Sequence, residues 1–167
     1  AEQKQDKPSI LSVPLWTDAS FTQSQDETLF FMYGRALVLA HTKHSKETLT
    51  GVIIFNMALV IYARAIERGT TTLLSTALKF YGKAAAVMNN YNATSACDHW
   101  ILLAIYNNMA QIHSYQWSSQ EVRECIDNVR MLLSTVSAES FIDQEDLHLF
   151  SANTILHIQA MKIAPAA

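Results

Sequence analysis

The chain has 167 residues, half of them hydrophobic, with a formal net charge of −3, which fits one domain with a sizeable core. Four glycines and three prolines are too few for a turn-rich β-sandwich and favour long helices. Charged residues make up only 16% of the chain and form no basic stripe, which argues against a nucleic-acid partner.

Residues 1–28 are expected to form an extended N-terminal arm, because they are polar and irregular apart from one apolar island at 10–16. Residues 29–33 and 36–39 then flank Gly34. Aromatic and aliphatic residues around a glycine predict one bent strand or a short hairpin. The start of a helix is the alternative for this segment.

Five helices are predicted in the remainder of a mainly α domain that covers residues 29–163. Ser45 is placed as the N-cap of a helix over 46–68, and Gly69 as its left-handed C-terminal residue. A second helix follows over about 72–89. Ser95 and Ser118 each begin a capping-box pattern, Ser95-x-x-Asp98 and Ser118-x-x-Glu121, so two more helices start there. The last helix spans about 143–162, and residues 164–167 are expected to be a loose tail. The apolar face of this last helix is expected to comprise Leu147, Phe150, Ile155 and Ile158.

A short phrase occurs twice: Asn56-Met57-Ala58 recurs as Asn108-Met109-Ala110. Both copies lie in an apolar helix that a second amphipathic helix follows, which predicts stacked antiparallel helix pairs of the tetratricopeptide-like kind. The spacing exceeds the ~34 residues of a standard tetratricopeptide repeat. The last helix would cap the stack, and an ordinary helical bundle with a chance repeat is the alternative. The close helix crossings are expected at Ala58 with Ala77, Tyr81 and Ala84, and at Ala110 with Val122, Ile126 and Val129.

Four motifs, at residues 31–37, 54–59, 107–113 and 164–167, resemble the expanded set of tetratricopeptide-like proteins of diatoms. The resemblance implies a short β element that leads into stacked helix pairs. It implies no enzyme activity.

No constellation for catalysis, a metal or a cofactor is predicted. His41-x-x-His44 is the only close histidine pair, and it lacks further metal-ligand partners. Cys97 and Cys125 are too few for a four-cysteine zinc site; one disulfide between them is possible in principle, and free buried thiols are favoured. The apolar run at 51–66 is shorter than the ~20 residues that a membrane span needs, so no transmembrane segment is expected.

The sequence therefore favours a non-catalytic interaction or scaffold module that binds a protein partner on a helical-repeat surface. The alternative is a permanent structural subunit of a large organellar or membrane-associated complex. An intracellular location is favoured, an organelle included. The residues predicted to line the partner-binding face are Phe55, Leu59 and Tyr62 in the first unit and Asn107, Gln111 and Ser114 in the second.

Overall fold

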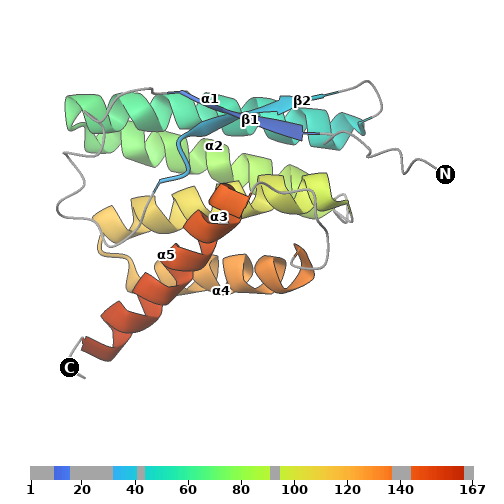
Figure 1. Cartoon of the computed structure of the whole chain (residues 1–167). Helices are drawn as coiled ribbons and strands as arrows, with labels where there is room; N and C mark the ends of the chain where they lie inside the picture. The colour runs from blue at the N-terminus through green and yellow to red at the C-terminus, as the bar shows by residue number, and fades with distance from the viewer. Residues whose placement is uncertain (1–9, 16–31, 41–43, 91–94, 137–143, 164–167) are drawn as a thin grey trace.

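The computed structural model describes residues 10–15, 32–40, 44–90, 95–136 and 144–163. Over these residues, a small two-stranded sheet precedes five helices, so the predicted fold class is confirmed (Figure 1). The strands are β1 (Ile10–Pro14) and β2 (Arg35–Leu39). The helices are α1 (Lys46–Arg68), α2 (Thr71–Asn90), α3 (Ala96–Tyr115), α4 (Ser119–Val136) and α5 (Gln144–Ile163).

Both ends of α1 and the start of α3 follow from local chemistry, as predicted. The Ser45 hydroxyl accepts a hydrogen bond from the Thr48 N–H at the start of α1, and Gly69 ends that helix with φ 60°. At the start of α3, Ser95 and Asp98 form both halves of a capping box. These side chains satisfy backbone groups that have no partner within the helix, so they fix where each helix begins.

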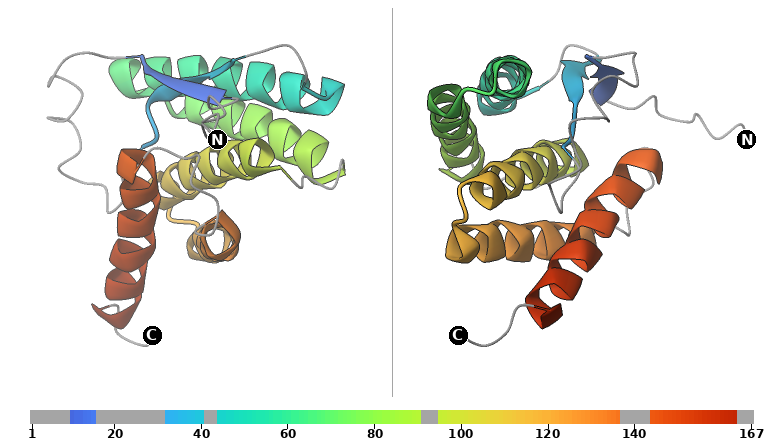
Figure 2. Two further views of the ribbon diagram at one scale, coloured as in Figure 1. Left: turned by 45° about the vertical axis from the view of Figure 1, so that its right-hand side comes forward. Right: turned by 90° about the vertical axis from the view of Figure 1, so that its left-hand side faces the viewer.

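The helices stack in consecutive antiparallel pairs. α1 packs along α2 and α3 along α4, while α3 also touches α1 and α5 (Figure 2). The small residues expected at the helix contacts are buried: Ala58, Ala77 and Ala84 fully, and Ala110 nearly so. Gly51 serves the same purpose, since a Cβ atom there would overlap the Sδ atom of Met88.

β2 forms part of the segment predicted as one bent strand or a short hairpin, whose residues 29–31 lie outside the described residues. The pairing of this strand was not predicted: β2 pairs with β1, antiparallel from Ile10 opposite Leu39 to Pro14 opposite Arg35. The partner strand comes from the apolar island of the expected arm. Its alternating pattern explains the pairing, because Ile10 and Leu37 turn inward into the core while Leu11 turns outward.

Helix α5 also corrects an expectation. Phe150 is buried and the half-buried Leu147 packs against the core, as the predicted apolar face requires, but Ile155 is 54% exposed. Ile158 and the tail at 164–167 lie outside the residues whose side chains are described. α5 instead turns polar side chains inward, and those described as buried are Asp146, Asn153, Thr154 and His157.

Candidate protein-interaction surfaces

The face predicted to bind a partner is buried within the protein. Phe55, Leu59 and Tyr62 have no exposed surface. Asn107 and Gln111 are each 1% exposed, and Ser114 is half-buried. Five of these six side chains are therefore covered in this structure, and Ser114 is partly exposed.

The chain's own segments cover this face. The ring centroid of Phe55 lies 6.4 Å from that of Tyr33, just before β2, and 5.7 Å from that of Tyr81 in α2. The Nδ2 atom of Asn153 in α5 donates a hydrogen bond to Oδ1 of Asn107. The residues before β2 and helix α5 thus occupy the surface that an open helical repeat would offer to a ligand.

Two asparagines hold the main chain of this covering segment. The Tyr33 N–H donates to Oδ1 of Asn108 (2.8 Å), and Nδ2 of Asn108 donates to the Tyr33 carbonyl (3.1 Å). In the same way, the Leu37 N–H donates to Oδ1 of Asn56 (2.9 Å), whose Nδ2 donates to the Leu37 carbonyl (2.8 Å). Asn56 and Asn108 are the equivalent residues of the repeated Asn-Met-Ala phrase. The repeat therefore places the same amide on α1 and on α3 against one extended strand.

The backbone of residues 33–39 alternates between its two neighbours. Tyr33 and Leu37 direct their N–H and C=O groups to the helices, whereas the Gly34 carbonyl accepts a bond from the Leu15 N–H on the β1 side. The side chains alternate as well: Tyr33 and Leu37 are buried, and Val38 is 46% exposed. The segment therefore lies between the helices α1 and α3 on one side and the strand β1 on the other.

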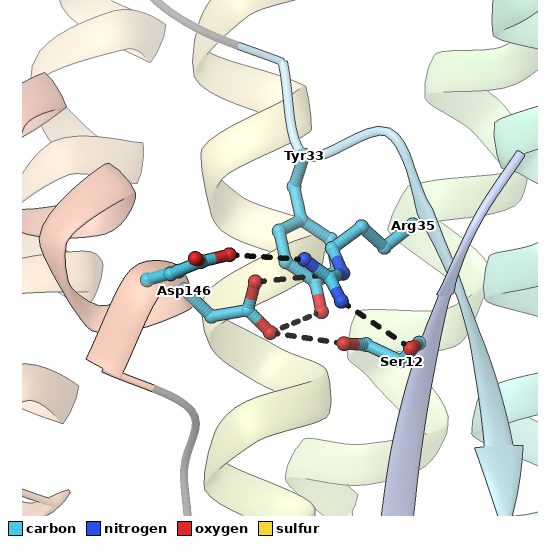
Figure 3. Close-up of polar contacts among 5 residues, drawn as sticks. Ser12, Tyr33, Arg35 and Asp146 are labelled. Carbon is cyan, nitrogen blue, oxygen red and sulfur yellow. Dashed lines mark hydrogen bonds and ion pairs between the residues drawn. The ribbon is translucent and has the colours of Figure 1, made fainter. Parts of the chain in front are cut away.

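A polar cluster surrounds the buried carboxylate of Asp146 at the start of α5 (Figure 3). Its Oδ2 atom accepts hydrogen bonds from the Tyr33 hydroxyl (2.9 Å) and the Ser12 hydroxyl (3.2 Å). The Nε atom of Arg35 lies 3.8 Å from Oδ1 of Asp146, and its Nη1 atom lies 3.8 Å from Oε2 of Glu145. Because the Glu145 side chain is 83% exposed, water screens that pair, and the Asp146 contacts contribute most. Charge-assisted hydrogen bonds thus join α5 to β1 and to Tyr33 just before β2, and Arg35 of β2 adds an ion pair.

Three tyrosine hydroxyls lie in the interior. Burial raises the pKa of Tyr33, and the Asp146 carboxylate raises it further. Burial also raises the pKa of Tyr62 and Tyr81, and the hydrogen bond that Asn108 donates to the Tyr81 hydroxyl (3.0 Å) offsets part of the latter. The three tyrosines are therefore neutral core residues at physiological pH; the hydroxyls of Tyr33 and Tyr81 are hydrogen-bonded, whereas that of Tyr62 is buried without a hydrogen-bonding partner among the described residues.

The accessible apolar surface lies on the other side of α1. Four large side chains at helical spacing are each about half exposed, and they define what we call the outer apolar face. They are Leu49, Ile53, Met57 and Val60. β2 packs on α1, and three more large side chains, Leu11, Val13 and Val38, are exposed on the sheet.

Helix α1 as a whole is strongly apolar. Among the described helices, it alone is long and apolar enough to cross a membrane, a test that an apolar core helix also passes. Its opposite face packs in the core through Phe55 and Tyr62. α1 is thus apolar on both its buried and its exposed side.

Trp117 stands out in the turn between α3 and α4. It is 92% exposed, and among the described non-glycine residues it alone has a positive φ, 55°. Its position is the one after a helix where glycine is favoured, and the Ser118 N–H closes the turn on the His113 carbonyl (3.0 Å). An indole here gains little from packing while its backbone is in a costly region.

Two histidines and two cysteines were weighed as metal ligands or disulfide partners. His41 lies outside the described residues, and Nε2 of His44 lies 3.4 Å from the Ala40 carbonyl oxygen. Cys97 and Cys125 are buried thiols that form no disulfide with each other, the arrangement that the sequence favoured. Within the described ranges, no three potential metal ligands come together.

Comparison of the chain with protein-family models, with curated proteins and with solved structures finds no match.

Sequence reasoning missed the two asparagines that matter most here. Asn56 and Asn108 belong to the repeated phrase, but the prediction of stacked helices rests on the alanines of that phrase. The signal was the amide itself, because a buried amide in an apolar helix must find hydrogen-bonding partners. Asp146 gave no such signal, since an acidic residue in the first turn of a helix is common.

Proposed function

We propose that this protein is a non-catalytic interaction or scaffold module that docks an apolar surface of a protein partner on the outer apolar face. The observation that carries the proposal is the row of four half-exposed side chains on α1. Contiguous exposed apolar patches are uncommon on proteins that act alone, and they are typical of docking surfaces.

The magnitude is adequate for a specific contact. Complete burial of one large aliphatic side chain contributes roughly 1.5–3 kcal/mol, so burying the remaining half contributes about 1 kcal/mol each. The four α1 residues and the exposed residues of the sheet then offer several kcal/mol before the entropy loss of association is subtracted. The stacked helix pairs and the short β element agree with what the resemblance to the tetratricopeptide-like proteins of diatoms implies, so that resemblance is part of this proposal.

A second candidate function uses the same surface. A permanent structural subunit of a large organellar or membrane-associated complex would keep this face covered at all times. The apolar character of both sides of α1, together with a charged fraction of 16%, favours this candidate.

The test is affinity capture of the tagged full chain from its source cells, followed by quantitative mass spectrometry. The double variant Ile53→Glu with Met57→Glu puts two charges on the outer apolar face. The matched control, Met131→Glu with Ile155→Glu, makes the same kind of change at side chains that are 60% and 54% exposed on α4 and α5. Circular dichroism and thermal melting establish that both variants keep the fold.

We expect the α1 variant to lose its partners and the control to keep them. A stoichiometric set of subunits would favour the permanent complex, and a few substoichiometric partners would favour an exchangeable module. Equal capture by both variants would contradict docking on this face.

A further inference from the structure

We propose that Asn56 and Asn108 form a two-point clamp for the backbone of an extended peptide, and that the chain's own segment 33–37 occupies this clamp as an intramolecular ligand. The peptide that can replace it in trans has the pattern aromatic-x-Arg-x-Leu. The site is independent of the outer apolar face.

The clamp binds the main chain of the segment through two side-chain amides, one on α1 and one on α3. A carboxamide offers one acceptor and two donors, so a single asparagine can accept from an N–H and donate to a C=O of the same residue. Both asparagines do this, at Tyr33 and four residues later at Leu37. Only main-chain atoms of the ligand take part, so the clamp holds any extended chain in one register.

The neighbouring side chains supply the sequence preference. The Tyr33 ring lies 5.1 Å, centroid to centroid, from that of Phe150, and its hydroxyl donates to Asp146. Arg35 lies beside the carboxylates of Asp146 and Glu145. Leu37 is 1% exposed. A ligand thus places an aromatic hydroxyl, a guanidinium and a leucine at alternate positions.

The placement of the amides argues for a binding site rather than for simple packing. An amide loses hydration when it is buried, completely at Asn108 and partly at Asn56. The same amide recurs at the equivalent position on two helices, and each amide forms hydrogen bonds with the main chain of segment 33–37. A ligand from outside must compete with a tethered segment at an effective concentration of about millimolar, so trans binding requires a weakened cis segment.

The experiment uses the full chain and a fluorescent peptide that copies residues 32–39, with anisotropy as the readout. Arg35→Glu weakens the cis segment, because it sets a carboxylate against Asp146. Arg130→Glu is the matched control, since Arg130 pairs with Asp127 on the exposed surface of α4. We expect the Arg35→Glu chain to bind the peptide at least about tenfold more tightly than the wild type or the control.

Adding Asn56→Ala to the Arg35→Glu chain should weaken peptide binding by about tenfold, the effect of losing two hydrogen bonds. A peptide with glutamate in place of its arginine should not bind. If the folded Arg35→Glu chain binds no better than the wild type, or if binding ignores Asn56→Ala, the proposal is overturned.

Hydrogen exchange of the wild-type chain decides the matter if Arg35→Glu does not fold. The amides of Tyr33 and Leu37 should then exchange at least about 100-fold faster than core amides of α3 such as that of Ile105, because the segment opens without global unfolding. Exchange at the rate of the slowest core amides would mean that the segment is a permanent part of the core, and would overturn the proposal.

Discussion

Asn108→Ala should destabilise the protein far more than the loss of one average side chain. Asn108 has no exposed surface, and its amide serves three groups: the Tyr33 N–H, the Tyr33 carbonyl and the Tyr81 hydroxyl, at 2.8, 3.1 and 3.0 Å. Alanine leaves all three without this partner. Each buried polar group that loses its hydrogen bond costs about 1–3 kcal/mol, and a water molecule in the vacated space would recover part of this. We therefore expect the free energy of unfolding to fall by roughly 3–5 kcal/mol.

Urea denaturation followed by circular dichroism measures this change. With a slope of about 2 kcal/mol per molar, the midpoint should move down by roughly 1.5–2.5 M. Asn128→Ala is the control, because Asn128 on α4 makes one exposed bond to the Glu124 carbonyl, and its effect should stay within about 0.5 kcal/mol. A loss below about 1 kcal/mol for Asn108→Ala, with an unchanged slope, would refute the reasoning about the clamp.

Further predictions concern the clamp, ionisation, a thiol and a turn. Combining Asn56→Ala with Asn108→Ala should cost less than the sum of the single changes in urea denaturation, because both release the same segment; strict additivity would contradict this. The free energy of unfolding should fall as the pH rises above about 10, because burial raises the pKa of Tyr33, Tyr62 and Tyr81 and the native state then binds more protons than the unfolded state. Absorbance at 295 nm should show these three of the six tyrosines ionising only on unfolding, and ionisation of all six in the native state would be inconsistent with their burial. Burial and the neighbouring Glu124 and Glu121 raise the pKa of Cys125 to about 12. In a Cys97→Ala chain at pH 8, Cys125 should therefore react with a thiol reagent at least about 1,000-fold more slowly when the chain is folded than when it is unfolded. Trp117→Gly should raise the free energy of unfolding by about 0.5–1 kcal/mol, since it relieves a left-handed backbone, whereas Trp117→Ala should not; a destabilised glycine variant would show that the indole packs.

The predictable part of the fold was local. Ser45, Gly69 and Ser95 satisfy backbone groups within a few residues of themselves, so their patterns mark the helix ends without knowledge of the remaining chain. The antiparallel stacking followed from the repeated phrase and the small residues beside it.

The unpredictable part depended on distant contacts. Ile10 pairs with Leu39, and the residues of neither segment identify the other segment as its pairing partner. α1 is apolar on two sides, so composition could not tell Phe55, which faces the core, from Ile53, which faces outward. On α3, Asn107 was predicted to line a binding face, but its neighbour Asn108 holds the segment that covers that face.

The central claim is that a protein partner docks on the outer apolar face. The most direct measurement places a photo-crosslinking amino acid at Ile53 in one chain and at Met131 in another, and irradiates both in source-cell extract. Docking on α1 predicts a discrete protein adduct from position 53 and none from position 131. No adduct from position 53, or the same adducts from both positions, would contradict the claim.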